Sequence, residues 1–152
     1  MADYYPPVGF HFRVNIEGLE TDTNEKDIGF QEVSGINASV GEYTFEEGGE
    51  NRFIHRLPER ISYENLILKR GVLHGSKLIE WFRNAVESYR FEPKGVLVTL
   101  LNNEHEPVES WTFINAYPVK WSVSNFDAQS NELAVETIEL AYQYFRRMDN
   151  NE

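Results

Sequence analysis

The chain has 152 residues, of which 41% are hydrophobic and 14% aromatic, with no cysteine and a formal net charge of −11 at pH 7. This length suits one domain with a core of its own, and the composition argues against a disordered chain. The lack of cysteine excludes disulfides and thiolate metal sites, and so acidic a surface disfavours tight binding of nucleic acid or anionic membranes.

Two further expectations concern location. Residues 1–7 lack the basic and apolar regions of a signal peptide, and no run of about 18 apolar residues is present that could form a transmembrane helix. We therefore expect a chain that folds in the cytoplasm of its producing cell and has no membrane anchor.

Strands dominate the first half of the chain. Residues 10–16 alternate apolar with polar side chains, which is the period of a half-buried strand. Four strands are expected in this half, at 10–16, 28–33, 36–45 and 61–70. Loops are expected at 20–27, which is polar, and at 46–51, which is rich in glycine and glutamate, and Pro58 interrupts the extended segment that resumes at Phe53.

One helix is expected, over residues 76–87. Ser76 can serve as its N-cap, because a serine side chain there accepts a hydrogen bond from a backbone N–H that has no partner in the helix. The apolar stripe at helical spacing comprises Leu78, Ile79, Phe82 and Val86. Trp81 is expected beside this stripe and not at its centre.

The second half predicts a hairpin and a closing strand. Strand 95–101 turns at 102–104 into a long return strand from Val108, and the closing strand covers about 132–145. Pro118 cannot donate a hydrogen bond to a ladder, so it implies an edge, a bulge or a break. Six side chains of the return strand are expected on one face: Trp111, Phe113, Tyr117, Val119, Trp121 and Val123.

These elements define the expected fold class, which is mainly β: an antiparallel β-sandwich or barrel with one inserted α-helix and long loops. We expect a single domain, 1–152, with residues 1–8 and 146–152 as terminal extensions. Several strands carry apolar residues on both faces, whereas one face of so small a sheet is usually wet. Either the helix and loops cover the second face, or other subunits do.

The sequence offers no recognisable catalytic or metal site. The histidines His11, His55, His74 and His105 do not have zinc-site spacing, and the glutamates of 46–51 lack the Asp/Asn alternation of a calcium loop. Nucleophile-elbow, P-loop and dinucleotide-binding motifs are absent from the sequence. We therefore predict no catalytic residue, no metal, no cofactor, and a protein that is not an enzyme.

Two other classes remain open at this point. The aromatic face from Trp111 to Trp121 could form a carbohydrate- or receptor-binding platform, although core packing is the more common use of such a face. A small hydrolase that uses clustered carboxylates is also open, since among 25 acidic residues some pair always lies close. Three basic residues are expected to pair with acidic loops of the same or a neighbouring subunit: Arg56, Lys69 and Arg70.

Five segments, taken in order, resemble the phage tail tube protein family. They read FQEVSGI at 30–36, YTFEEGGEN at 43–51, YENLILKRG at 63–71, WTFINAYPVK at 111–120 and ETIELA at 136–141. Trp81 also matches an aromatic residue on the family's inserted helix. The chain departs from the family pattern at Glu59-Arg60, where the family has a glycine, and in its aromatic ending, 142–145.

The resemblance implies a structural subunit with a barrel-like fold that forms hexameric rings, stacked as the hollow inner tube of a contractile phage tail or injection system. The implied partners are further copies of the chain, sheath and baseplate proteins, and DNA or effector protein that passes through the lumen without tight binding. Cytoplasmic assembly in a bacterium and incorporation into a virion or phage-tail-like particle are implied as well. A tube initiator or baseplate-proximal ring paralogue is the alternative within the family.

The expected contact residues come from one loop and from the basic residues named above. The resemblance implies that the 43–51 loop contacts the next ring of the tube. The full set of expected subunit or ring contacts is Tyr43, Glu46, Glu47, Gly48, Gly49, Glu50, Asn51, Arg56, Lys69 and Arg70.

Overall fold

A computed structural model describes residues 11–19, 28–49, 51–72, 75–124 and 134–148. In chain order its elements are β1 (Phe12–Ile16), β2 (Gly29–Phe30), β3 (Glu32–Ser34), β4 (Ala38–Phe45), β5 (His55–Tyr63), β6 (Leu66–Gly71), α2 (Lys77–Glu87), β7 (Lys94–Leu101), β8 (Pro107–Val123), β9 (Val135–Ala141) and β10 (Tyr144–Met148). Parts of the prediction lie outside the described residues: the loop 20–27, the terminal residues 1–8 and 149–152, and residues 132–133 of the closing strand.

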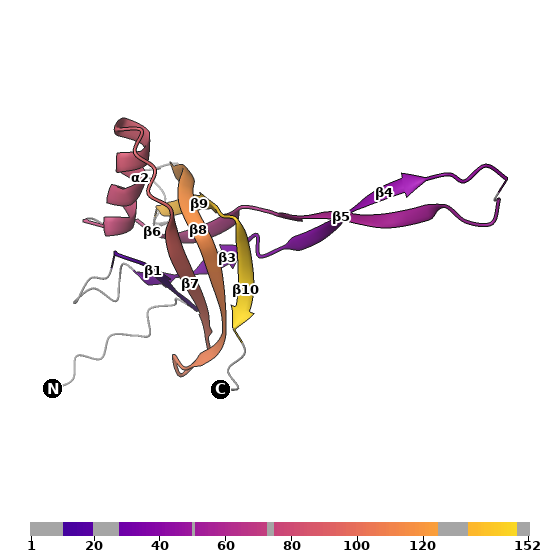
Figure 1. Cartoon of the computed structure of the whole chain (residues 1–152). Coiled ribbons are helices and arrows are strands. Elements are labelled where there is room, and N and C mark those ends of the chain that lie inside the picture. Colours follow the sequence, from indigo (N-terminus) through magenta and orange to yellow (C-terminus); the bar gives the residue numbers. More distant parts are fainter. Residues whose placement is uncertain (1–10, 20–27, 50, 73–74, 125–133, 149–152) are drawn as a thin grey trace.

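An antiparallel sheet closes on itself and forms the body of the molecule (Figure 1). Its strand order is β2-β1-β7-β8-β9-β6-β3, and β10 pairs with β8. Because β2 and β3 follow one another in the chain, the segment 29–34 pairs with β1 at one end and with β6 at the other. Between them, the N–H of Gln31 donates to the carbonyl oxygen of Lys69 at 3.0 Å. The predicted antiparallel barrel with one helix is confirmed.

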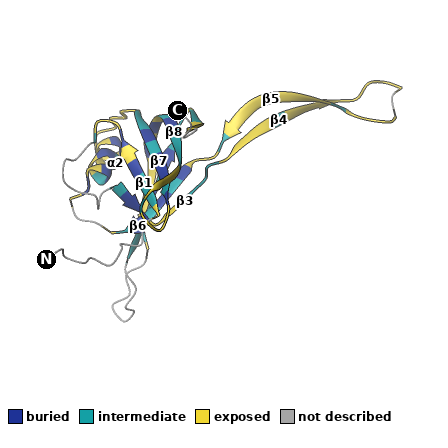
Figure 2. Cartoon of the chain, turned by 90° about the horizontal axis from the view of Figure 1, so that it is seen from below, coloured by how far each residue is buried: buried dark blue, intermediate teal, exposed yellow. Residues whose placement is uncertain are grey.

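The barrel interior holds the hydrophobic core. Alternation along each strand turns every second side chain inward, and facing strands pair these side chains across the ladder. Val96 pairs with Phe113 between β7 and β8, and Leu66 pairs with Leu140 between β6 and β9. All four are fully shielded from solvent, and the buried residues lie in the barrel and under α2 (Figure 2).

β8 does not keep one face toward the core, contrary to the sequence prediction. Between Phe113 and Ala116, β8 contains one residue more than the facing segment of β7, and Asn115 adopts a positive φ of 51°. Such a bulge reverses the side to which the following residues point. Phe113 and Ala116 are therefore both buried, whereas Tyr117 and Val119 point outward and are 36% and 44% exposed.

A second irregularity of β8 follows at Pro118, where the sequence predicted an edge, a bulge or a break. Pro118 pairs with Leu140, but Lys120 pairs with Glu139, so β8 again has one extra residue. The extra residue returns Trp121 to the side of the buried Ile138, with which it pairs. Its ring centroid lies 6.3 Å from that of Phe82 on α2, while its side chain stays 38% exposed.

Helix α2 begins where predicted but buries a different face. Ser76 is its N-cap, and its hydroxyl oxygen accepts a hydrogen bond from the backbone N–H of Ile79 at 3.3 Å. Trp81, expected beside the apolar stripe, belongs to the buried face at 4% exposure, whereas Val86, expected on that stripe, is 63% exposed. The indole fits this position because its N–H donates to the carbonyl oxygen of Glu92 at 3.0 Å.

Two long predicted strands are each divided in two, and the short predicted strand 28–33 is also divided, at Gln31, into β2 and β3. The predicted strand 61–70 is interrupted at residues 64–65, where β5 ends and β6 begins. The predicted closing strand is interrupted at 142–143, between β9 and β10, and β10 takes in residues 146–148 of the expected terminal extension. The interruption at 64–65 marks the place where the chain passes from a second, smaller sheet into the barrel.

Candidate functional site: a projecting arm

β4, β5 and the segment between them form an arm that projects away from the barrel (Figures 1 and 2). We use this name for residues 38–63, of which residue 50 is not described. Among the described residues its strands pair only with each other, and nearly all of its side chains are exposed. A two-stranded hairpin alone is marginally stable in water. The arm therefore depends on the packing at its base for a fixed position, and contact with another surface would order it further.

Large apolar side chains are exposed on both faces of the arm. Tyr43 and Leu57 form a cross-strand pair, and they are 54% and 49% exposed. Val40 and Ile61 form another pair, 56% and 54% exposed. The two pairs point to opposite faces, because the bulge of the hairpin lies on β5 and β4 alternates without interruption. Large apolar side chains exposed on both faces of one projecting segment indicate a site of contact with another protein.

Aromatic contacts shape the outer part of the arm. Phe45 stacks on His55 with ring centroids 4.7 Å apart, and Phe53 meets the same imidazole edge-on at 4.9 Å. His55 Nε2 also lies 2.9 Å from Glu47 Oε2. These contacts tie the loop to the ends of β4 and β5 without a core beneath them.

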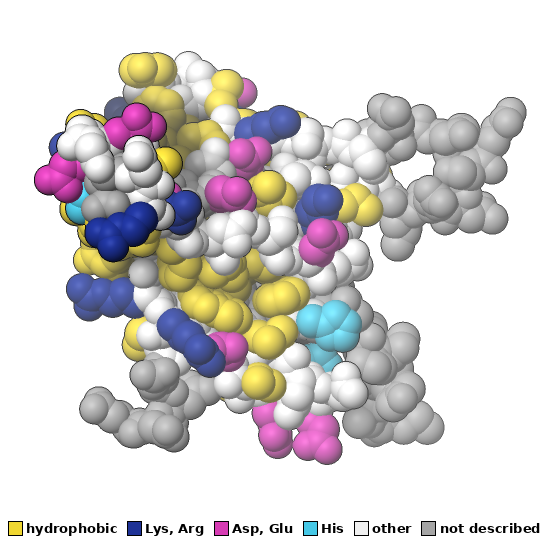
Figure 3. Space-filling view, turned by 90° about the vertical axis from the view of Figure 1, so that its right-hand side faces the viewer, with side chains coloured by type: hydrophobic (Ala, Val, Ile, Leu, Met, Phe, Trp, Pro, Cys, Tyr) yellow, Lys and Arg dark blue, Asp and Glu magenta, His cyan; other side chains and the backbone are white. Residues whose placement is uncertain are grey.

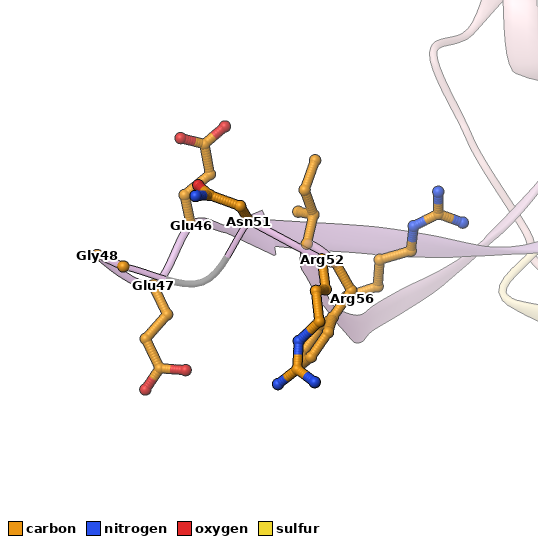
Figure 4. A pocket seen from close by; sticks show the side chains of 9 residues that line it. Glu46, Glu47, Gly48, Asn51, Arg52 and Arg56 are labelled. Atoms are coloured by element: carbon orange, nitrogen blue, oxygen red, sulfur yellow. The ribbon is translucent and has the colours of Figure 1, made fainter.

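Charged side chains at the tip of the arm point away from one another (Figure 4). Glu46 and Glu47 lie on opposite sides of the loop, and the guanidinium groups of Arg52 and Arg56 diverge. They border an open hollow of about 830 Å³. Divergent charges cannot converge on one reacting atom or ion, but they can pair with charges on a second surface.

The barrel face from which the arm projects is apolar as well (Figure 3). Hydrophobic side chains gather in the middle of this view, with charged side chains above, below and between them. An apolar centre with a polar rim is the usual anatomy of a protein–protein interface. The candidate contact surface therefore includes the arm and the barrel face beside it.

The base of the arm is fixed to the barrel by packed aromatic side chains. Tyr63, the last residue of β5, contacts Tyr142 and Phe145 at centroid distances of 5.8 and 5.4 Å. Phe113 of the core contacts Tyr142 at 4.8 Å. Burial, and then the neighbouring Tyr63 and Glu64, raise the pKa of Tyr142 to about 12. Its phenol therefore stays protonated at physiological pH, and the cluster remains uncharged there.

Gly35, which precedes the arm, should tolerate no side chain. Its φ is +85°, and an added Cβ would lie 2.0 Å from the carbonyl oxygen of Asn65. An alanine there would combine the strain of a left-handed backbone conformation with a steric clash against the backbone. We therefore expect Gly35→Ala to lower the free energy of unfolding by at least about 2 kcal/mol, measured by chemical denaturation. The control is Gly48→Ala, where an added Cβ meets nothing within 4 Å. Equal stability of the two variants would contradict this prediction.

Two of the predicted contact residues do not lie on the arm. Lys69 is on β6 of the barrel, where its Nζ is 4.0 Å from Glu32 Oε1. Arg70 is 2% exposed. Its Nε donates to Glu136 Oε1 at 2.6 Å, and its Nη2 donates to Ser76 Oγ at 2.6 Å. Arg70 thus pairs within the subunit, where it joins β6 to β9 and to the N-cap of α2.

The arm brings the other described contact residues together. They are Tyr43, Glu46, Glu47, Gly48, Gly49, Asn51 and Arg56. Glu50 and His74 lie outside the described residues. Five exposed apolar side chains of the arm were not among the predicted contact residues: Val40, Phe53, Ile54, Leu57 and Ile61. The sequence signal for these residues is the presence of apolar side chains on both faces of a strand, which indicates burial of the second face by another subunit.

The described part of the chain shows no converging ligand set or membrane-crossing helix. Its His, Asp and Glu residues form no group of three or more that could hold a metal ion, and none of its helices is long and apolar enough to span a bilayer. The aromatic platform considered for sugar binding is divided, because Trp111 packs against the core and Tyr117 points outward.

A closed barrel with a long exposed arm defines a class of protein: a structural subunit that associates through its surface. A profile of the T4-like virus tail tube protein gp19 family matches residues 8–146. The chain therefore belongs to the tail tube protein family, and the resemblance of its sequence segments to that family is confirmed.

Solved structures place the same fold in contractile particles. A chain in the cryo-EM structure of the anti-feeding prophage baseplate is 31% identical, with 97% of this chain and 99% of that chain covered and a TM-score of 0.81. A chain in the sheath–tube complex of the extracellular contractile injection system PVC is 28% identical, with 97% and 93% covered and a TM-score of 0.73. Hcp1 from Flavobacterium johnsoniae shares the fold at 17% identity, with 91% and 94% covered and a TM-score of 0.53. No curated protein sequence matches closely enough to add to this comparison.

Proposed function

We propose that this chain is a non-catalytic subunit that assembles with copies of itself into hexameric rings, stacked as the hollow inner tube of a contractile tail or injection system. The observation that carries the proposal is the match to the tail tube family over residues 8–146. The exposed arm supports it, because a surface that is apolar on both faces needs cover that the subunit does not supply.

The arm is the proposed link to neighbouring subunits. Its apolar pairs supply the buried centre of the contact, and the tip charges of Glu46, Glu47 and Arg56 supply a polar rim. Lys69, on the barrel surface, belongs to the same proposed set, whereas Arg70 acts inside the subunit. Each contact can be modest, because a tube repeats it many times.

The acidic composition fits a conduit. At a net charge of −11, the subunit repels DNA phosphates, so DNA or an acidic effector protein would slide through a lumen without adhering. We propose sheath and baseplate proteins as the outer and end partners of the tube. Assembly in the bacterial cytoplasm, followed by incorporation into a virion or phage-tail-like particle, completes the proposed route.

A baseplate-proximal ring is the second candidate within the family. The chain from the anti-feeding prophage baseplate has a TM-score of 0.81 to this chain, against 0.73 for the chain from the PVC sheath–tube complex. This higher similarity is the observation that supports a subunit at the start of the tube as the second candidate.

Electron microscopy of the purified chain, alone and with sheath and baseplate partners, tests both candidates. Hollow tubes formed by the chain alone would support a shaft subunit. Single six-fold rings that form only on baseplate partners would support an initiator. Monomers at high concentration, with no subunit rings even beside those partners, would overturn the proposed function.

A further inference from the structure

α2 lies on the side of the barrel away from the arm, and an aromatic row follows it in the chain (Figure 1). We use this name for Tyr89, Phe91 and Tyr117, which are 84%, 43% and 36% exposed. Tyr89 meets Phe91 edge-on with centroids 5.1 Å apart, and Phe91 meets Tyr117 edge-on at 6.0 Å. The three side chains hold one another in place while much of their surface stays in water. Val119, 44% exposed, extends the row along β8.

Tyr89 carries backbone strain that its own subunit does not offset. It follows the C-cap residue Ser88 and adopts a positive φ of 48°. The N–H of Arg90 donates to the carbonyl oxygen of Asn84 at 3.2 Å and closes the helix end. Glycine is the usual residue at such a position, because a side chain is strained there. Since Tyr89 is 84% exposed, packing within the subunit cannot explain a tyrosine, and strain of this kind is retained at functional sites.

We propose that the aromatic row receives the arm of a second copy of this chain; the inference rests on the proposed function. The arm exposes apolar side chains on both faces and needs an apolar counterpart. The 8 residues of β4 extend over roughly 26 Å, so the tip reaches beyond its own barrel. A contact between two different surfaces of one chain is heterologous, and it repeats from copy to copy.

The margins of the two surfaces are compatible in charge. Glu87, Arg90 and Glu92 flank the row in sequence, and the tip of the arm carries glutamates as well as Arg56. Both margins thus hold both signs, which allows opposite charges to pair around an apolar centre. Tyrosine is among the side chains that most often dominate the binding energy at such a centre.

Tyr89→Gly tests the row with effects of opposite sign on folding and on assembly. Glycine relieves the left-handed strain, so the melting temperature of the unassembled subunit should stay level or rise by roughly 2–4 °C. The concentration needed for assembly should rise at least about tenfold, measured by sedimentation of the assembled fraction. Tyr89→Phe keeps both the aromatic side chain and the strain, and it should assemble like the wild type.

Crosslinking identifies the occupant of the row. The chain has no cysteine, so the variants Arg90→Cys, beside the row, and Thr44→Cys, on the arm, each carry one thiol and keep Tyr89 and Leu57 in place. When the two variants are mixed and assembled, a short bismaleimide should join them into a dimer of one copy of each. Neither variant alone should give that product in comparable yield, because each then lacks the facing thiol.

The outcomes separate this inference from the proposed function. If the wild type forms subunit rings or tubes, while Tyr89→Gly assembles at the wild-type concentration and the mixed crosslink is missing, the inference is overturned and the proposed function stands. Crosslinking of Arg90→Cys to a sheath protein in place of the arm would overturn it too. If the wild type forms no subunit rings under any condition, the proposed function itself fails.

Discussion

The double substitution Tyr43→Ser and Leu57→Ser should abolish assembly while leaving the barrel folded. The two side chains face each other across the arm and are 54% and 49% exposed, so their truncation removes apolar contact surface and no part of the core. Loss of two such anchors should weaken each contact between subunits by about 2–4 kcal/mol, a roughly 30- to 1,000-fold weaker association. Sedimentation and negative-stain microscopy would follow assembly, and far-UV circular dichroism the fold.

A matched control for this result lies on the same strand. Thr44→Ala changes an exposed polar side chain of β4 between the two apolar positions Tyr43 and Phe45, and it should assemble normally. Tubes formed by the double variant at wild-type concentrations would remove the arm from the contact. Unfolding of the double variant would instead assign these side chains to the stability of the subunit.

The largest loss of stability should follow from Arg70→Ala. This change leaves Glu136, which is 1% exposed, as a buried carboxylate without the guanidinium at 2.6 Å. Trp121 Nε1, 3.3 Å from Glu136 Oε2, offers only a neutral donor in return. Removal of one partner of a buried ion pair lowers the free energy of unfolding by about 3–5 kcal/mol, which urea denaturation followed by tryptophan fluorescence can measure.

Two comparisons isolate the buried charge as the cause. Arg83→Ala disrupts an ion pair with Glu87 in which both side chains are largely exposed, so it should change stability by less than about 1 kcal/mol. Combining Arg70→Met with Glu136→Leu removes both charges and should recover most of the loss. A single Arg70→Ala variant as stable as Arg83→Ala would show that the buried pair contributes nothing.

Local pattern was sufficient to predict the antiparallel strands, the helix start at Ser76 and an irregularity at Pro118, for which an edge, a bulge and a break were all open. It failed where contacts distant in sequence decide the outcome. The β8 bulge at Asn115 has no glycine to signal it, so the alternation of apolar residues predicted one face where the structure has two. Trp81 is buried because the carbonyl oxygen of Glu92, beyond the end of α2, accepts its N–H.

The candidate site was only partly predictable for a related reason. The strands of the arm and the buried strands have the same apolar pattern. This pattern does not show whether the apolar side chains are buried by the same chain or by another one. The prediction that Arg70 contributes to a contact between subunits rested on its charge. Its partner Glu136 is 66 residues away and joins it only when β6 pairs with β9. Family resemblance, carried by ordered motifs, predicted the assembly role that periodicity alone left open.

The arm must also avoid aggregation before it contacts a partner. A newly made subunit presents unpaired hydrogen-bonding groups along both outer edges of β4 and β5, the usual template for amyloid-like aggregation. Pro58 lacks an N–H, the β5 bulge distorts the edge beside it, and Glu42, Arg56 and Arg60 add exposed charge. These features discourage strand-to-strand growth but leave the apolar side chains accessible. These features would allow an unassembled subunit to avoid strand-to-strand aggregation while its contact surface stays available.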